Sequence, residues 1–341
     1  MKIRIKEYWN KLKAEYKNKY KENIFKNYEQ TVPVFEEFRN FLNELLNKYP
    51  TNVDIICILA SVELELGYQE TAIKLLEDFI LKYKDVINDV DKARIYTNLS
   101  FYYEADKKQD KYLLEAEKLN SPFVETYKGL ALTYFSNYEY NKTTEDLYKS
   151  LKYLEKALKI TNDYEIYFGY AVCLFETKQY QKAKEIFEEL LLEYPNRMRL
   201  LLSISYCEAY LGNKEKAIHY LKQVKVDQDE NYYLTTDDIH DFQIFEVYYF
   251  LEEYDLFLEE CEKVIESFYF ADWNHYFYTL WLKNESEKFN KYIDKYKNEM
   301  LEAIEEAKID DDFSGNTTFC NTYFSTRTRT FCRSKAMWRT G

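Results

Sequence analysis

The residue types that most often carry out chemistry are few in this sequence, and their spacing does not suit a catalytic or metal-binding site. The three histidines, His219, His240 and His275, stand far apart in the sequence, whereas paired zinc ligands are normally about two to five residues apart. The sequence contains no His-Glu-x-x-His motif, no glycine-rich phosphate loop and no Gly-x-Ser-x-Gly elbow. We therefore predict that the protein is not an enzyme and holds no metal and no cofactor.

Adjacent acidic residues are the remaining candidates for acid–base catalysis. Two carboxylates act as general acid and base only when their environments separate their pKa values. These pairs lie in strongly polar helical stretches, where carboxylates are ordinarily hydrated. We interpret them as parts of solvated helix surfaces. The pairs are Glu188-Glu189, Glu252-Glu253 and Glu259-Glu260.

Four of the six cysteines lie within helical patterns and are separated by tens of residues. This spacing is typical of reduced, buried thiols and not of a disulfide framework or a zinc site. The first 13 residues are charged and lack the apolar core of a secretory signal, and the apolar stretch 55–60 is too short to span a bilayer. We expect a cytoplasmic protein with no membrane segment. The four cysteines are Cys57, Cys173, Cys207 and Cys261.

The elements that position all these residues must be helices. The chain of 341 residues has only 6 Gly and 4 Pro, against average usages of about 7% and 5%. Sheets and barrels need many turns, and turns consume both residues. Hydrophobic residues make up 46% of the chain, which excludes general disorder. The composition predicts an all-α protein.

The charge of the chain bears on its partners. It has 47 basic and 60 acidic residues, a net charge of −13. This excess repels nucleic-acid backbones and anionic bilayers. It favours a cationic partner, or it serves solubility alone.

An internal repeat indicates how the helices are organised. In two segments a proline, a glycine and an alanine recur in this order at the same offsets from one another. The glycine supplies a left-handed turn between two antiparallel helices, and the alanine lets the second helix approach the first. The landmarks are Pro50, Gly67 and Ala72 in one segment, and Pro195, Gly212 and Ala217 in the other.

These landmarks resemble the tetratricopeptide repeat, a helix–turn–helix unit of about 34 residues. The resemblance covers residues 50–225 well and 3–308 loosely, without a Trp at the first aromatic position. It implies a right-handed α–α superhelix, or solenoid. The residues that match the pattern are Tyr96, Leu99, Ser100 and Tyr103; Tyr127, Leu130, Ala131, Tyr134, Ser150, Leu154 and Ala157; and Tyr167, Tyr170, Ala171, Leu174, Ala183, Phe187 and Leu190.

The quality of the match suggests four segments. We predict a degenerate helix pair over 1–49, split near Pro33, and repeats over 50–225. A degenerate repeat and capping helices follow over 226–308, and a disordered tail over 309–341. Within the tail, residues 310–341 contain no Leu, Ile, Val or Glu; the alternative is a basic tail that binds an acidic partner.

Two stretches depart from the repeat pattern. The small residues Ala131 and Ser150 stand seven positions further apart than their counterparts in the other units, so we expect a loop insertion within 136–149. Insertions in such arrays often lie on the binding face. The polar connector 225–238 is either a flexible joint or an acidic rim.

In this family the first helix of each unit lines a concave groove. The groove is mostly aromatic and suits an apolar or amphipathic helix; alternatively, these rings pack against neighbouring helices. The family's carboxylate-clamp pattern is not matched, because Cys57 and Ser61 stand where its first Lys and Asn would be. Carried over residue by residue, the groove positions are Arg94, Asn98, Phe101, Lys128, Phe135, Phe168, Phe175, Arg199, Tyr206, Tyr210, Phe242 and Tyr249.

The sequence thus favours a scaffold or adaptor that binds a protein or peptide in this groove. Two alternatives stay open. One is a regulator that senses a small peptide, and the other is an inhibitor or immunity protein that binds a cationic toxin. The acidic charge would steer such a toxin to the protein.

Overall fold

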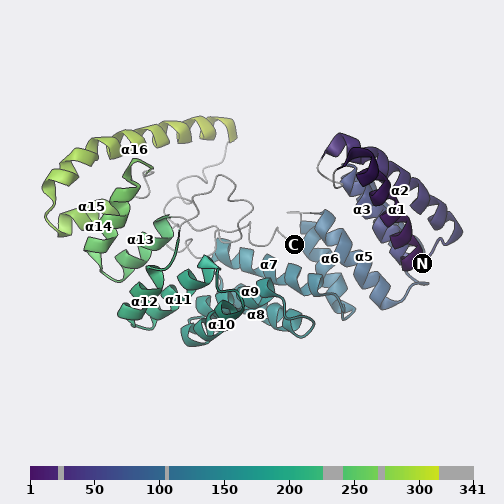
Figure 1. Ribbon diagram of the computed structural model, residues 1–341, viewed down its shortest axis with the longest axis horizontal. Coiled ribbons are helices and arrows are strands. Elements are labelled where there is room, and N and C mark those ends of the chain that lie inside the picture. The colour runs from purple at the N-terminus through teal and green to yellow at the C-terminus, as the bar shows by residue number, and fades with distance from the viewer. Residues whose placement is uncertain (22–26, 104–106, 226–240, 268–272, 315–341) are drawn as a thin grey trace. The chain divides into compact units, whose positions relative to one another are not determined.

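The computed structural model describes residues 1–21, 27–103, 107–225, 241–267 and 273–314 (Figure 1). Within these ranges the chain forms α-helices and one short 3-10 helix, and no strand. The all-α prediction is confirmed. None of the described helices is both long and apolar enough to cross a membrane.

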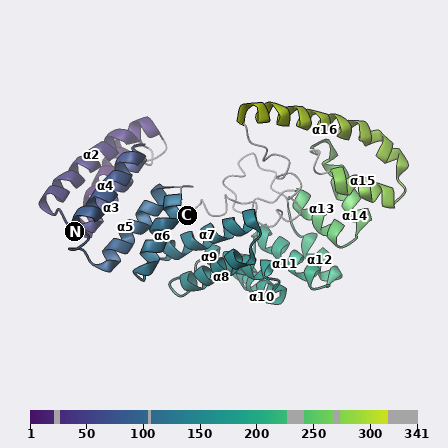
Figure 2. The same ribbon diagram turned by 180° about the vertical axis from the view of Figure 1, so that it is seen from behind.

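The helices form successive antiparallel pairs that follow one another along the chain (Figures 1 and 2). This is the tandem helix–turn–helix arrangement that the repeat landmarks predict. The helices are α1 Lys2–Tyr20, α2 Tyr28–Lys48, α3 Val53–Glu65, α4 Gln69–Tyr83, α5 Asp89–Tyr102, α6 Lys107–Lys118, α7 Val124–Asn141, α8 Thr144–Leu158, α9 Tyr164–Glu176, α10 Tyr180–Glu193, α11 Met198–Tyr210, α12 Lys214–Leu221, α13 Asp241–Phe250, α14 Tyr254–Lys263, α15 Trp273–Leu282 and α16 Ser286–Ser314.

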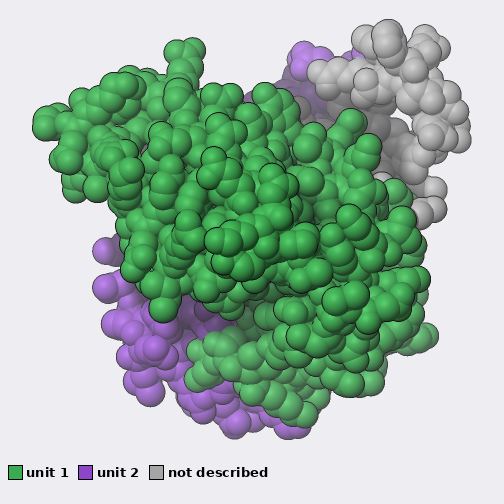
Figure 3. Space-filling model, turned by 90° about the vertical axis from the view of Figure 1, so that its right-hand side faces the viewer, with its two compact units in different colours: residues 1–162 green, residues 163–341 purple. Residues whose placement is uncertain are grey.

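The packing divides the chain into two compact units, residues 1–162 and 163–341 (Figure 3). The first contains α1 to α8 and the second α9 to α16. The predicted segment limits at 49, 225 and 308 reflect how well each stretch matches the repeat pattern, and they stay predictions. Each unit has its own buried apolar core, because consecutive pairs cover each other's apolar faces.

The turn inside a pair has a recurring backbone geometry. Gly67 and Gly212 have φ values of +82° and +79°, in the left-handed region, as predicted. Lys178, Glu252 and Asn284 occupy the same position in three further pairs, with φ between 57° and 63°. In all five turns the next amide N–H donates to a carbonyl five residues back at 2.8–2.9 Å. This is the hydrogen bond of a Schellman motif, which closes the end of the first helix.

Five residues after each of these turns lies a contact point for the second helix. Ala72, Ala183 and Ala217 have no exposed surface there, as expected for a position of close helix approach. In the last two pairs the same position holds Phe257 and Phe289. The small residue is therefore lost toward the C-terminal end, as the sequence indicates.

The N-terminal pair differs from its prediction, because the chain does not break near Pro33. The break lies between Tyr20 and Tyr28, and Pro33 lies inside α2. The Asn27 side chain accepts a hydrogen bond from the Gln30 N–H at 3.3 Å and caps the helix there. Pro33 stands in the second turn of the helix, so it removes only one backbone hydrogen bond near the start of α2.

The predicted loop within 136–149 is wrong. Helix α7 continues to Asn141 and α8 begins at Thr144, so only two residues separate them. The seven extra residues lengthen both helices because their helical apolar period continues, with Leu147 buried. Ser150 still contacts Ala131, donating to its carbonyl at 2.8 Å, which confirms the pairing of these two positions.

At the C-terminal end, α16 extends to Ser314 and so includes the first residues of the predicted tail. Residues 315–341, with Cys320 and Cys332, lie outside the described residues, as does most of the connector 225–238. Helix α16 is much longer than α15 and runs past it (Figures 1 and 2).

Candidate functional site

Two of the carboxylates that the sequence singles out make contacts with neighbouring side chains. Glu189 accepts a hydrogen bond from the Tyr167 hydroxyl at 2.7 Å, and Glu260 pairs with Lys263 at 2.8 Å. Among the residues that the structure describes, no group of three or more His, Cys, Asp or Glu side chains could hold a metal ion. One carboxylate of the pair Glu188-Glu189 and one of the pair Glu259-Glu260 thus make contacts at helix surfaces.

The four cysteines of the helical patterns are buried and, among the residues that the structure describes, are in no disulfide, as the sequence predicts. Burial raises the pKa of both Cys57 and Cys207 to about 12. A thiol with such a pKa is protonated at neutral pH and is a poor nucleophile. Both cysteines act as small apolar core residues.

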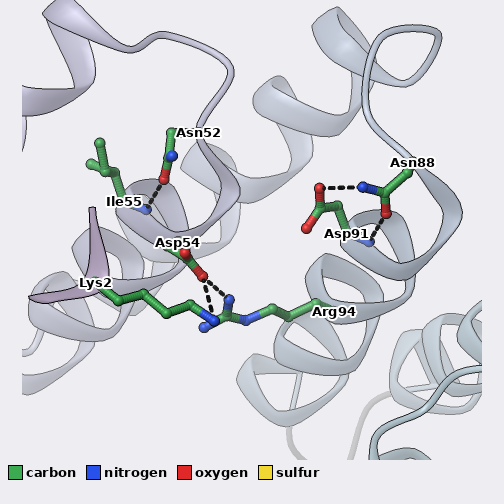
Figure 4. A network of polar contacts seen from close by, with 7 residues as sticks. All are labelled: Lys2, Asn52, Asp54, Ile55, Asn88, Asp91 and Arg94. Carbon is green, nitrogen blue, oxygen red and sulfur yellow. Dashed lines mark hydrogen bonds and ion pairs between the residues drawn. The ribbon is translucent and has the colours of Figure 1, made fainter.

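In the first unit, two predicted groove residues serve to join helices α3 and α5. The Arg94 guanidinium forms an ion pair with Asp54, and the Lys2 ammonium lies 3.4 Å from the same carboxylate (Figure 4). Asn98, one turn after Arg94, hydrogen-bonds the Cys57 thiol and lowers its pKa slightly against the larger effect of burial. Arg94 and Asn98 thus contact neighbouring helices.

Asparagine caps fix where these two helices begin, and so they fix the ion pair. Asn52 accepts a hydrogen bond from the Ile55 N–H at 3.1 Å, and Asn88 accepts one from the Asp91 N–H at 2.9 Å (Figure 4). Each cap satisfies a helix N–H that would otherwise lack a partner. The caps place Asp54 in the first turn of α3, where a negative charge is also favoured by the helix dipole.

The other predicted groove residues of the first unit differ in how exposed they are. Phe101 is 48% exposed, whereas Phe135 is buried and packs against Tyr138 with ring centroids 6.0 Å apart. Lys128 is half-buried on α7. These side chains do not form one continuous aromatic surface.

In the second unit, three predicted aromatic residues come together. Phe175 of α9 meets Tyr206 and Tyr210 of α11 edge to face, with ring centroids 6.5 and 5.2 Å apart. The Tyr206 hydroxyl also donates to the carbonyl of Gln243 on α13 at 3.2 Å. The contacts thus link three consecutive first helices of the unit.

Two further rings, which sequence reasoning missed, complete this group. Tyr210 stacks on Tyr180 at 4.9 Å and on Phe250 at 4.6 Å, with interplanar angles of 28° in both cases. Their nearness to the turns could have pointed to them. Tyr180 stands two residues after the turn residue Lys178, and Phe250 stands two residues before the turn residue Glu252. We call Phe175, Tyr180, Tyr206, Tyr210 and Phe250 the aromatic cluster.

The remaining predicted residues of this unit have other surroundings or lie outside the described residues. Phe168 is 2% exposed and packs on Phe187, so here the packing alternative holds. Arg199 is largely buried. Tyr249 stacks on His275 with centroids 4.1 Å apart. The side chain of Phe242 lies outside the described residues.

The aromatic cluster is neutral, and carboxylates stand near it. Burial raises the pKa of Tyr206 well above its usual value, and the negative charge of Glu246 adds to the effect. The pKa of Tyr210 is raised by burial first, and then by Tyr180, Glu176 and Glu246. The phenols therefore remain protonated donors in a weakly negative field.

Comparisons with known proteins find tetratricopeptide repeats. Residues 145–204, from α8 into α11, match the tetratricopeptide repeat family model, and no curated protein sequence matches the chain. Among solved structures, YrrB, whose title reads "a TPR protein with an unusual peptide-binding site", is 16% identical, with 54% of this chain and 90% of that chain covered and a TM-score of 0.45. A tetratricopeptide repeat protein from Parabacteroides merdae ATCC 43184 is 12% identical, covering 76% and 93%, with a TM-score of 0.42.

A third similar structure is TTC0263 from Thermus thermophilus, which is 16% identical over 58% of this chain and 98% of that chain, with a TM-score of 0.37. Stacked repeats of this kind present extended surfaces for protein interaction. Residues 145–204 thus match the tetratricopeptide repeat family, and the landmark glycines and alanines recur with the same helix–turn–helix pairing on either side of this stretch.

Proposed function

We propose that this protein is a scaffold or adaptor that binds a protein or peptide partner through the aromatic cluster of its second unit. The observation that carries the proposal is the exposure of the cluster. Tyr210 is 44% and Phe250 49% exposed, although each ring is held by a stacked neighbour. Aromatic side chains that are both rigid and exposed lose little conformational entropy when a partner covers them.

The composition of the cluster indicates what it would bind. Its rings offer apolar faces, and its tyrosine hydroxyls offer hydrogen bonds at the edges. Tyr and Trp are over-represented among interface residues that carry binding energy, because they combine these two properties. The rings come from three consecutive helix pairs, so they suit an elongated ligand such as an amphipathic helix.

The cluster also differs from the first unit in a way that favours it as the binding surface. There, Arg94 is engaged by Asp54 and Phe135 is buried, so neither is exposed for a partner. In the second unit, the exposed rings are contiguous. That the protein has no enzymatic activity, and that it binds neither nucleic acid nor membranes, remain predictions.

The test compares two matched surface variants of the full chain. Tyr210→Ala removes the central ring of the cluster, and Leu192→Ala removes a side chain on α10 that is 86% exposed. Each protein is immobilised, used to capture partners from native lysate, and analysed by mass spectrometry; the captured protein is then purified and titrated. We expect Tyr210→Ala to weaken binding about tenfold or more and Leu192→Ala to leave it unchanged.

Circular dichroism and melting temperature show whether Tyr210→Ala stays folded. If it does not, Phe250→Ala removes an exposed ring at the end of the stack instead. Equal binding by folded Tyr210→Ala, Phe250→Ala and the parent would overturn the proposal.

A further inference from the structure

The net negative charge of this protein is concentrated in one part of the chain. Residues 1–225 contain 35 basic and 35 acidic residues and are neutral overall, whereas residues 226–314 contain 7 basic and 25 acidic residues. The local net charge is therefore −18, in the stretch that includes α13 to α16. Electrostatic attraction of a cation acts there and not over the whole surface, since charges are screened beyond about 10 Å at ordinary salt.

The same stretch exposes large aromatic side chains. Helix α15 buries Trp273, Tyr276 and Leu280 on one side. On its other side Tyr278 is 47% and Trp281 66% exposed, with ring centroids 5.9 Å apart. These two rings are not among the groove positions of the repeat pattern, and the core does not need them.

Carboxylates border these rings. Glu252 is exposed in the turn before α14, and Tyr254 is the first residue of that helix, where desolvation raises its pKa and the charges of Glu252 and Tyr278 add to the effect. Asp255 is highly exposed and pairs with Lys283, just beyond Trp281, at 2.6 Å. We call Glu252, Tyr254, Asp255, Tyr278 and Trp281 the acidic aromatic face.

We propose that the acidic aromatic face binds a basic segment of a partner protein, with Lys or Arg side chains lying over the Tyr278 and Trp281 rings. A cation above an aromatic ring is attracted by the ring's negative face, most strongly by Trp. The apolar stem of Lys or Arg covers the ring, while the exposed Glu252 balances the charge. The negative field of residues 226–314 repels an acidic segment.

The second unit already contains this kind of contact internally. The Lys295 ammonium lies 5.6 Å from the Trp273 ring centroid, and the Lys291 ammonium lies 4.7 Å from the Tyr292 ring centroid. Tyr278 and Trp281 present the same kinds of ring to solvent. The inference rests on the proposed function in requiring a protein partner, but it assigns a different set of residues and the partner's chemistry.

The test uses the full chain and two synthetic probes. One probe is an amphipathic helical peptide of Leu and Lys, and the other has Glu in place of every Lys. Binding is measured by calorimetry at low and moderate salt. We expect the Lys peptide to bind, to weaken as salt rises, and to outcompete the Glu peptide.

Variants then separate the face from diffuse charge attraction. Tyr278→Ala with Trp281→Ala should weaken binding of the Lys peptide about tenfold. Glu287→Gln with Glu302→Gln, which removes two exposed acids of α16 outside the face, should change it less than twofold. Glu252→Gln with Asp255→Asn is a second disruption of the face in case the aromatic variant unfolds.

Three results would overturn the proposal: no binding of the Lys peptide, equal binding of the Glu peptide, or equal weakening by the face and α16 variants. Tyr210→Ala distinguishes this failure from failure of the proposed function. If Tyr210→Ala no longer captures the partner but the face variants still bind the Lys peptide normally, the proposal for the aromatic cluster is supported. The proposal for the acidic aromatic face is then overturned. If only the face variants lose binding of the Lys peptide, and Tyr210→Ala captures the partner as the parent does, the acidic aromatic face is supported. The proposal for the aromatic cluster is then overturned.

Discussion

Tyr210 and Phe250, which belong to different helix pairs, stack with ring centroids 4.6 Å apart, and each remains nearly half exposed. The pair joins α11 to α13, and Phe250 belongs to the acidic stretch 226–314. It therefore contributes both to the cohesion of consecutive repeats and to the surface that they present.

A double-mutant cycle should detect this coupling. We expect Tyr210→Ala and Phe250→Ala to destabilise the protein less together than the sum of the single effects, by about 0.5–1.5 kcal/mol, because either change alone already breaks the stack. The free energy of unfolding is measured by urea denaturation. Additive effects would show that the rings do not interact in solution.

The left-handed turn residues give a prediction about backbone conformation. Lys178→Gly should stabilise the protein by about 0.5 kcal/mol, because a side chain at φ +63° is strained and glycine is not. Gly212→Ala should destabilise it by about 1 kcal/mol for the same reason. Lys182→Gly, inside α10, is the matched control and should destabilise by about 1 kcal/mol. If Lys178→Gly lowered the melting temperature as much as Lys182→Gly does, the turn assignment would be contradicted.

Close approach of the paired helices predicts the effect of a large side chain at Ala183. This alanine has no exposed surface, so Ala183→Trp should destabilise by roughly 1–3 kcal/mol or more through overpacking. Leu192→Trp, at an exposed position of the same helix, serves as the control and should melt like the parent. If both variants melt like the parent, the repeat register is wrong.

Glu77 of the first unit gives a prediction about pH. Desolvation raises its pKa, but hydrogen bonds from the Tyr112 and Tyr103 hydroxyls, both at 2.7 Å, outweigh this effect and leave the pKa below its usual value. A carboxylate whose folded-state pKa is lowered stabilises the protein at pH values above its unfolded pKa of about 4.5. This contribution is lost as the pH falls through the folded pKa.

The melting temperature should therefore fall more steeply in the parent than in Glu77→Gln as the pH is lowered from about 5.5 to 3.5. Glu29→Gln, at an exposed position of α2, is the control and should follow the parent. Parallel pH profiles for the parent and Glu77→Gln would contradict the role of Glu77.

Thiol reactivity tests the burial of the cysteines. With a pKa of about 12, Cys57 and Cys207 should resist iodoacetamide in the folded protein at pH 8 and react after denaturation. Peptide mass spectrometry reports the labelling of each cysteine. Rapid labelling of Cys207 in the folded state would mean that α11 opens locally.

The sequence by itself determined the class of fold and the local geometry of its turns. Scarcity of Gly and Pro excluded sheets, and the spacing of Gly67 to Ala72 and of Gly212 to Ala217 predicted helix–turn–helix pairs. Both signals are local, because helix period and turn conformation depend on residues a few positions apart. For the same reason the buried cysteines could be predicted from their place in helical patterns.

Only the tertiary structure decided which side chains are available to a partner. Phe101 and Phe168 are both predicted groove residues, yet the first is half exposed and the second is buried against Phe187. Tyr180 and Phe250 joined the aromatic cluster although the pattern did not single them out. The exposure of a ring depends on the side chains that neighbouring helices bring to it, and those come from other helix pairs of the chain, beyond the range of any helical period.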